Sequence, residues 1–216
     1  MFFWICILLM VLSFFGYATI NKGSNIKNVL YLFVGIMTLI SGFRSHIGND
    51  YDTYIMDFFQ YSDYGDLIDI IEDLRREPTE AFLIYLLSGL GLEYQMLIFA
   101  YSVITFLLII IILKDRFRSN YYLIFIGVIT FALDYSMMWY SYSIIRQMVA
   151  ELICLYSVKY LSNDESKSRF FFSVLLAMLF HYSAIVFILA YFVPRKMIKM
   201  KSFTIVLMIT FAIYFF

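Results

Sequence analysis

Several apolar stretches of this chain are each about 20 residues long, the length that an α-helix needs to cross a bilayer. Hydrophobic residues make up 63% of the chain and charged residues only 15%, a ratio that excludes an ordinary soluble domain. The stretches are continuous rather than alternating, which favours helices over strands. We therefore predict an all-α, multi-pass transmembrane protein in which residues 1–216 form a single integral membrane domain.

The sequence predicts about seven membrane segments with boundaries good to a few residues. They are residues 1–20, 29–43, 94–113, 121–140, 143–161 and 170–193, with an incomplete seventh at 203–216. The N-terminus lacks the basic region of a signal peptide, so the first segment is predicted to be retained. The short last run predicts either a truncated chain or a partly inserted helix.

The basic residues predict the orientation of these segments. They gather in three short loops, at Lys22 and Lys27, at Lys114, Arg116 and Arg118, and at Lys167 and Arg169. Because cytoplasmic loops are rich in lysine and arginine, these loops are predicted to lie inside, with the N-terminus and residues 44–93 outside. The basic residues after position 194 do not fit a single span over 170–193. Either that span breaks near His181 and turns back as a hairpin, or the charge rule fails there.

The long outer segment, residues 44–93, is predicted to be helical rather than irregular. Leu67, Ile70, Ile71 and Leu74 recur at helical spacing among charged residues, as in an amphipathic helix at a membrane surface. Pro78 is predicted to begin a second short helix that ends before the glycines at 89 and 91, because proline suits the first helical turn.

A first polar cluster follows the second predicted membrane segment. It comprises Arg44, His46, Asp50, Tyr51, Asp52 and Tyr54. If the residues from 50 onward form a helix, Tyr51, Tyr54 and Phe58 share one face. The alternatives are that Asp50 only caps that helix and that Arg44 only reaches toward the interface.

A second polar cluster, Arg146, Gln147 and Glu151, lies near the outer end of the fifth segment. Charged side chains within a bilayer usually face a cavity or a partner. One interpretation is a structural ion pair of Arg146 with Glu151 or Asp134. The other is an anion clamp, since a guanidinium matches phosphate oxygens.

Two further features admit both a structural and a functional interpretation. His181 is either a hydrogen-bonded core residue or part of a cavity. The rings of Tyr135, Trp139, Tyr140 and Tyr142 form either an aromatic belt or a sugar-stacking surface. Cys6 and Cys154 lie in apolar runs, which is typical of small core residues. The net charge of zero suggests no nucleic-acid partner.

The two polar clusters and the aromatic rings face the same side under the predicted topology, and His181 could join them, so they indicate one outward-facing cavity. Arginines suit a pyrophosphate, aromatic rings suit sugars, and a carboxylate or histidine can take a proton from a hydroxyl.

Four short motifs in this order resemble those of the EpsG family. They are Arg44-x-x-Ile47-Gly48-x-Asp50-Tyr51-x-x-Tyr54, Glu77-Pro78 leading into residues 82–91, Ile145-Arg146-Gln147-x-x-Ala150, and Phe180-His181-x-Ser183-Ala184. Thr79 stands where the family pattern leads us to expect glycine. The family comprises Wzy-like polymerases of bacterial exopolysaccharide and capsule.

The resemblance implies a membrane glycosyltransferase of the C-type class in the bacterial cell membrane, with an extracytoplasmic active face. It would polymerise repeat units carried on polyprenyl pyrophosphate, alongside other polysaccharide-assembly membrane proteins, and would need neither a metal nor a cofactor. Arg44 and Arg146 would hold the donor pyrophosphate, while Asp50 or His181 would take the acceptor's proton. Tyr51, Tyr54, Gln147 and Trp139 would bind the substrate.

Three alternatives remain open at the level of sequence. A transporter or flippase of lipid-linked glycans would also need arginines and rings in a cavity, although the inner halves of most segments lack polar groups. A non-catalytic membrane scaffold predicts that residues 44–54 tolerate alanine. The resemblance also implies further spans after residue 216, so an inactive fragment of the polymerase is the third alternative.

Overall fold

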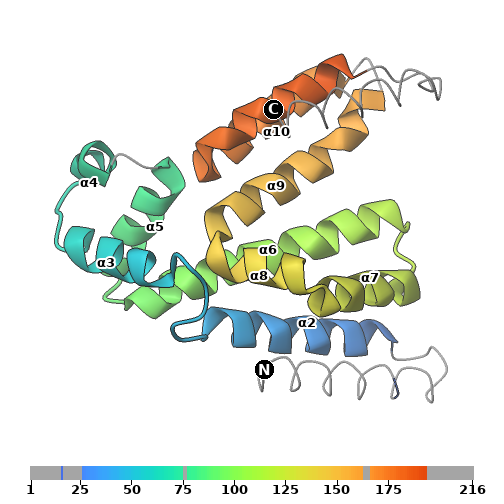
Figure 1. The fold of residues 1–216 in the computed structure, drawn as a ribbon, viewed down its shortest axis with the longest axis horizontal. Coiled ribbons are helices and arrows are strands. Elements are labelled where there is room, and N and C mark those ends of the chain that lie inside the picture. Colours follow the sequence, from blue (N-terminus) through green and yellow to red (C-terminus); the bar gives the residue numbers. More distant parts are fainter. Residues whose placement is uncertain (1–15, 17–25, 75–76, 163–165, 194–216) are drawn as a thin grey trace, which may run out of the picture.

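The computed structural model of the chain describes residue 16 and residues 26–74, 77–162 and 166–193. Within these residues every regular element is a helix, as predicted (Figure 1). The elements are α2 (Ile26–Gly42), α3 (Tyr51–Tyr61), α4 (Leu67–Leu74), α5 (Pro78–Gly89), α6 (Tyr94–Arg116), α7 (Tyr121–Leu133), α8 (Tyr135–Ser143), α9 (Ile145–Ser157), the 3₁₀ helix η1 (Val158–Ser162), α10 (Lys167–Phe180) and the 3₁₀ helix η3 (Tyr182–Phe192). The predicted segments at 1–20 and 203–216, together with Cys6 and the basic residues after 194, lie outside the described residues.

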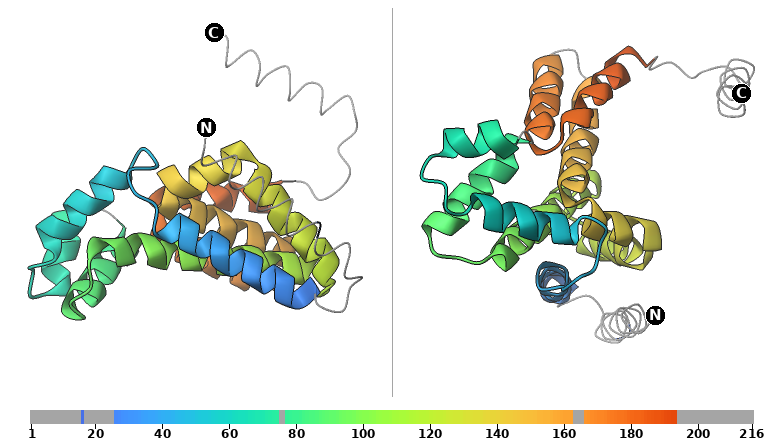
Figure 2. Two further views of the ribbon diagram at one scale, coloured as in Figure 1. Left: turned by 90° about the horizontal axis from the view of Figure 1, so that it is seen from below. Right: turned by 60° about the vertical axis from the view of Figure 1, so that its left-hand side comes forward.

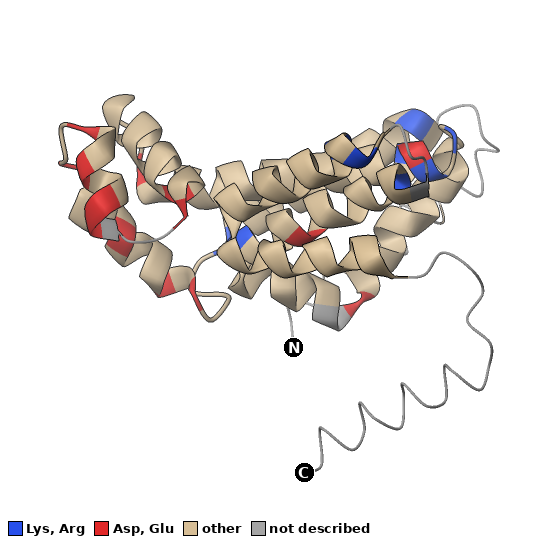
Figure 3. Cartoon of the chain, turned by 90° about the horizontal axis from the view of Figure 1, so that it is seen from above, with Lys and Arg blue, Asp and Glu red and all other residues tan. Residues whose placement is uncertain are grey.

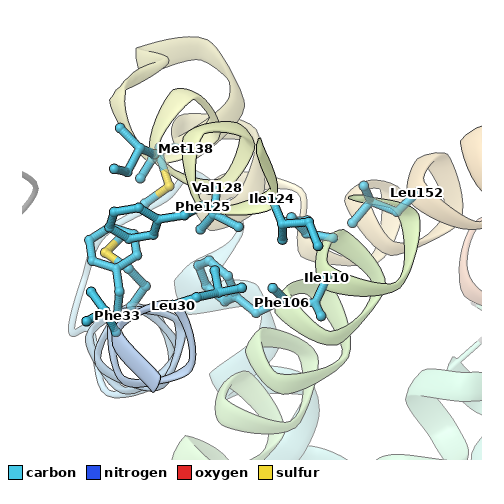
Figure 4. Packing of buried hydrophobic residues seen from close by; sticks show 14 of the residues in the cluster. Leu30, Phe33, Phe106, Ile110, Ile124, Phe125, Val128, Met138 and Leu152 are labelled. Carbon is cyan, nitrogen blue, oxygen red and sulfur yellow. The ribbon is translucent and has the colours of Figure 1, made fainter. Parts of the chain in front are cut away.

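The main bundle is built on α6, which packs against α2, α7 and α9 (Figure 1). Its apolar core takes Phe33 from α2, Phe106 from α6 and Phe125 from α7, among other large side chains (Figure 4). The rings of Phe33 and Phe125 meet edge to face with centroids 5.8 Å apart, which is a favoured aromatic geometry. This core fixes the frame on which the outer helices rest.

The three short helices α3, α4 and α5 gather at one end of the bundle (Figures 1 and 2). A second apolar core joins them to α6 and α9 through side chains such as Tyr54, Ile84 and Val149. The prediction of helices at 67–74 and from Pro78 onward is confirmed, and Pro78 stands in the first turn of α5. The outer segment is thus a packed helical group rather than an irregular loop.

The predicted segment 121–140 is divided at Asp134, where the chain bends by 68° between α7 and the main part of α8. The Oδ1 atom of Asp134 accepts a hydrogen bond from the backbone nitrogen of Met137 at 2.9 Å. An aspartate in this position caps the new helix and favours its start. The predicted segment 121–140 is therefore two helices, which as a bent pair still pass the length and composition test for a membrane span.

The predicted segment 170–193 breaks at His181, whose backbone is extended between α10 and η3. The chain then turns back, because Tyr191 near the end of η3 lies 5.1 Å from Phe171 near the start of α10, measured between ring centroids. Lys167 also lies over the ring of Tyr191. Of the two alternatives that the sequence left open, the hairpin at His181 is confirmed.

Among the described residues, α6 is the one helix long and apolar enough to cross a membrane alone, and α7 with α8 passes the same test as a bent pair. This finding does not confirm the seven predicted spans. Large apolar side chains also stay exposed, including Leu32, Phe172 and Leu189 at 59%, 69% and 63%. Apolar surface on this scale is typical of a face that contacts lipid.

The charges of the described residues separate along the molecule, with acidic residues on the outer helices and most basic residues at the far end of the bundle (Figure 3). Contacts also connect the helix ends that lie beside these basic residues. Lys27 lies over the ring of Tyr121, and Lys159 pairs with Asp115 at 3.1 Å. The described residues of the short basic loops therefore lie at the same end of the bundle.

Candidate functional site

A buried ionic cluster joins the start of α5 to the start of α9. The Nη1 atom of Arg146 lies 2.5 Å from Oε2 of Glu77 and 2.6 Å from Oε2 of Glu80. Glu77 is 5% exposed and Glu80 is fully buried. Such a cluster is stable only when its charges are paired, since burial of a lone charge is strongly unfavourable.

The local sequence explains why these carboxylates lie here. Glu77 is extended and directly precedes Pro78, which begins α5, and Glu80 lies in the first turn of that helix. The amino end of a helix favours negative charge. Arg146 lies in the first turn of α9, directly after the break at Ile144. The two helix starts therefore present opposite charges to each other.

Glu77 also binds the histidine at the end of α10. Its Oε1 atom lies 2.7 Å from Nδ1 of His181 and accepts a longer hydrogen bond, 3.4 Å, from the backbone nitrogen of Tyr182. A hydrogen bond of 2.7 Å from the hydroxyl of Thr79 to the carbonyl of Leu179 holds α5 against the same turn. One carboxylate therefore bridges Arg146 and His181.

Tyr54 of α3 closes the cluster from the outer helices. The Nε atom of Arg146 donates a hydrogen bond of 3.4 Å to the Tyr54 hydroxyl, and the guanidinium lies 5.4 Å from the centroid of the ring. Burial raises the pKa of Tyr54 to about 12, so its hydroxyl stays neutral at physiological pH. Within the described residues, no hydrogen bond engages the remaining nitrogen of Arg146, Nη2.

Glu77 contacts both Arg146 and His181, and Glu80 contacts the same arginine, so two carboxylates, a guanidinium and an imidazole meet at one place. A histidine held by a carboxylate is a common arrangement where a side chain accepts a proton during a reaction.

His181 also lines a cavity of about 570 Å³ between α9 and η3. The cavity wall is mostly apolar, with side chains such as Leu155, Val186 and Phe187, and its polar members are Gln147, Glu151, His181 and Ser183. Gln147 donates a hydrogen bond of 2.8 Å to Glu151. A cavity of this kind suits an amphiphilic ligand, with a polar group near His181 and an apolar chain beyond it.

The Arg44 side chain binds backbone carbonyls of the protein and does not extend toward a membrane–water interface. Its three nitrogens donate hydrogen bonds to the carbonyls of Ile47 at 3.1 Å, Ser41 at 2.5 Å and Tyr142 at 2.9 Å. The residue is 4% exposed, and burial lowers the pKa of its guanidinium to about 10. The alternative of an arginine that reaches toward the interface is therefore wrong.

The remaining residues of the first polar cluster take separate positions. Asp50 precedes α3 but makes no capping hydrogen bond, so the interpretation as a cap only is wrong. Tyr51 is buried, and its hydroxyl donates to Oε1 of Gln95 at 3.2 Å. His46 pairs with Asp52 in an exposed contact of 3.0 Å. Trp139 lies in α8 and is partly buried.

The structure thus brings together three of the predicted site residues, Tyr54, Arg146 and His181, and places Gln147 on the adjoining cavity. The predicted ion pairs of Arg146 with Glu151 or Asp134 are wrong, since Arg146 pairs with Glu77 and Glu80. Sequence reasoning missed both of these carboxylates as site residues. The available signal was two acidic residues around a helix-starting proline in an otherwise apolar neighbourhood.

Residues 27–216 match the family model described as EpsG family. The matched region contains all four motifs named above, and each of them contributes one residue to the cluster: Tyr54, Glu77, Arg146 and His181. No curated protein and no solved structure gave a significant match to the chain.

Proposed function

Because the chain belongs to the EpsG family, we propose that it is a membrane glycosyltransferase that polymerises lipid-linked oligosaccharides. Family membership and the apolar helices indicate a membrane protein of polysaccharide biosynthesis. The finer proposal is that repeat units carried on polyprenyl pyrophosphate are joined into extracellular or capsular polysaccharide. The bilayer and these lipid-linked units are the proposed partners.

One observation carries this proposal: His181 belongs to a buried ionic cluster and also lines a mostly apolar cavity. A lipid-linked sugar needs both environments, since its head group is polar and its carrier is a hydrocarbon. The cavity volume of about 570 Å³ lies within the range of small-molecule sites. A protein with only a structural ion cluster would not need to connect it to such a cavity.

In the proposed reaction, His181 takes the proton from the acceptor hydroxyl as that oxygen attacks the anomeric carbon of the donor sugar. The new glycosidic bond forms as the bond from the anomeric carbon to the pyrophosphate oxygen breaks. The lipid pyrophosphate departs with the bonding electrons. We assign stabilisation of this leaving group to Arg146, whose Nη2 atom is not engaged by the hydrogen bonds to Tyr54, Glu77 and Glu80.

The roles of the other predicted residues follow from their contacts. Arg44 already binds three carbonyls, so we assign it to holding the loop before α3 rather than to the pyrophosphate. Asp50, which makes no capping bond, remains the second candidate for the base. Gln147 lines the cavity and is proposed to contact the substrate, and Trp139 of α8 is proposed to contact the sugars.

The separation of charge supports an orientation in the bacterial cell membrane. The basic end of the bundle is proposed to face the cytoplasm, in line with the positive-inside rule (Figure 3). The helices α3, α4 and α5 and the ionic cluster then lie toward the outer face. Polymerisation would take place on that side, after the repeat units have crossed the membrane.

The test is to replace Arg146, His181 and Asp50 singly by alanine and to measure polymer length in cells, with membrane expression confirmed. Loss of long polymer is expected for Arg146→Ala and for His181→Ala. Two matched controls are His46→Ala, the other histidine, and Arg116→Ala at the basic end. Polymer of normal length in both the Arg146→Ala and the His181→Ala variant would exclude the proposed glycosyltransferase activity.

The same experiment separates a polymerase from a flippase of lipid-linked glycans. A polymerase defect leaves single repeat units at the outer face, whereas a flippase defect leaves them at the inner face. If the wild-type chain, expressed without any other source of the activity, yields no polymer, the alternative of an inactive fragment is supported instead.

A further inference from the structure

We propose that Glu77 is a positioning residue that holds His181 in the Nδ1–H tautomer, so that its Nε2 lone pair is free to take the acceptor proton. This inference rests on the proposed function, and it adds a residue that sequence reasoning did not place in the site. The geometry behind it is the 2.7 Å contact between Nδ1 of His181 and Oε1 of Glu77. A carboxylate can only accept, so the imidazole nitrogen must donate.

The Glu77 carboxylate is itself fixed in place. Its second oxygen, Oε2, lies 2.5 Å from Nη1 of Arg146, and the residue is 5% exposed. A group held at both oxygens cannot rotate without breaking one of two buried interactions. The direction from which it accepts the imidazole proton is therefore set by the fold, as with the carboxylates that orient histidines in other sites.

Backbone hydrogen bonds fix the main chain at His181. The nitrogen of His181 donates to the carbonyl of Ala177 at 3.0 Å, and its carbonyl accepts from the nitrogen of Ala184 at 3.0 Å. The break between α10 and η3 is thus anchored on both sides. With Nδ1 turned to Glu77, Nε2 is the ring nitrogen left for a ligand in the cavity that His181 lines.

Glu80 explains why the cluster contains two carboxylates. It binds the same Nη1 atom of Arg146 at 2.6 Å but makes no hydrogen bond to His181 in the described structure. Glu80 therefore contacts the guanidinium alone of these two groups, whereas Glu77 contacts both the guanidinium and the imidazole. The two acidic residues share one partner and have different roles.

The tautomer can be measured directly, because the chain contains only two histidines. The exposed His46 is replaced by glutamine, and the protein is labelled with ¹⁵N-histidine, placed in lipid nanodiscs and examined by ¹⁵N NMR above the pH at which the ring becomes neutral. The expected signal is the Nδ1–H tautomer in the H46Q background. Glu77→Ala is expected to restore the usual Nε2–H tautomer.

Glu80→Gln is the matched control, since it removes a carboxylate from the same guanidinium and leaves the contact of Glu77 with His181. This variant is expected to keep the Nδ1–H signal. An Nε2–H ring in the H46Q background, or a tautomer that does not respond to Glu77→Ala, would overturn the proposal. The H46Q spectrum decides the point even if the Glu77 variants fail to fold.

A second readout connects the tautomer to activity. Glu77→Gln is expected to lower the rate of polymer formation by about 10–100-fold, as is common when a residue that orients a reactive group is changed. Glu77→Asp, which keeps the charge, is expected to recover part of that loss, and equal loss in both variants would contradict the positioning role. Normal polymer in both Arg146→Ala and His181→Ala would exclude the proposed function while leaving the NMR result standing, so the two failures are distinguishable.

Discussion

Arg44 donates a hydrogen bond of 2.9 Å from Nη2 to the backbone carbonyl of Tyr142, 98 positions later in the chain. The guanidinium also lies 5.0 Å from the centroid of the Tyr142 ring. These contacts join the loop before α3 to the end of α8, directly before the helix that carries Arg146. Arg44 thus anchors the segment directly before α9, the helix that carries Arg146.

Replacement of Arg44 by lysine is expected to destabilise the protein although the charge is kept. A lysine ammonium lacks the planar fork of a guanidinium and cannot donate to all three carbonyls of Ser41, Ile47 and Tyr142. Buried acceptors therefore lose their donors. The loss in free energy of unfolding is expected to be about 1.5–3 kcal/mol. The midpoint of thermal unfolding in detergent checks this, with the exposed substitution Arg116→Lys as the control. Equal midpoints for the two variants would contradict it.

Gly48 is expected to tolerate no side chain. Its φ angle is 108°, a region that residues with a Cβ rarely adopt, and an added Cβ would overlap the carbonyl oxygen of Tyr142. Gly48→Ala should therefore lower the stability by at least about 1–3 kcal/mol and displace the Arg44 contact. Gly65→Ala is the matched control, since nothing lies within 4 Å of its added Cβ. The same unfolding measurement applies, and a Gly48 variant as stable as the Gly65 variant would refute the close approach of Gly48 to Tyr142.

The ionic cluster predicts strong coupling between Arg146 and Glu80. Arg146→Met alone leaves two carboxylates buried without their cation and is expected to destabilise the protein by about 3–5 kcal/mol. The double variant Arg146→Met with Glu80→Gln removes one of those charges, so it should be less destabilised than the sum of its single variants. A double-mutant cycle of unfolding measurements tests this, and additive effects would show that the two groups do not interact.

The sequence allowed correct prediction of features that depend on local patterns. Tyr51, Tyr54 and Phe58 share a helical face, and all three are buried in the structure. The break at His181 was expected as one of two alternatives because the basic residues after 194 would otherwise face the wrong side. Charge and periodicity can be read from neighbouring residues, because each reflects whether a side chain contacts water or an apolar environment.

The partners of Arg146 could not be predicted in the same way. Local spacing suggested Glu151 or Asp134, whereas the true partners Glu77 and Glu80 lie 69 and 66 positions away. Glu151 instead accepts a hydrogen bond from Gln147. The choice is made by the packing of α5 against α6 and α10, which brings the start of α5 to Arg146 and which no short window of sequence encodes. The bend at Asp134 was predictable in principle, because aspartate commonly caps a new helix.

The orientation of the bundle leads to a labelling prediction. Asp63 follows α3 at the acidic end, and Ser119 follows α6 at the basic end, so α6 with its 23 residues separates them. Single cysteines are introduced at these two positions after Cys6 and Cys154 have been replaced by alanine. In intact cells a membrane-impermeant maleimide is expected to label Asp63→Cys and not Ser119→Cys, because we propose that the basic end faces the cytoplasm.

Ser168→Cys in the first turn of α10 provides the control for this experiment. Lys167 and Arg169 flank it, and the hairpin at His181 returns the chain to that end, so it should follow Ser119→Cys and react only after the membrane is permeabilised. Labelling of Asp63→Cys and Ser119→Cys from the same side would contradict a membrane-spanning α6. Labelling of Ser119→Cys alone in intact cells would invert the orientation and place the ionic cluster toward the cytoplasm, where extracytoplasmic polymerisation could not occur.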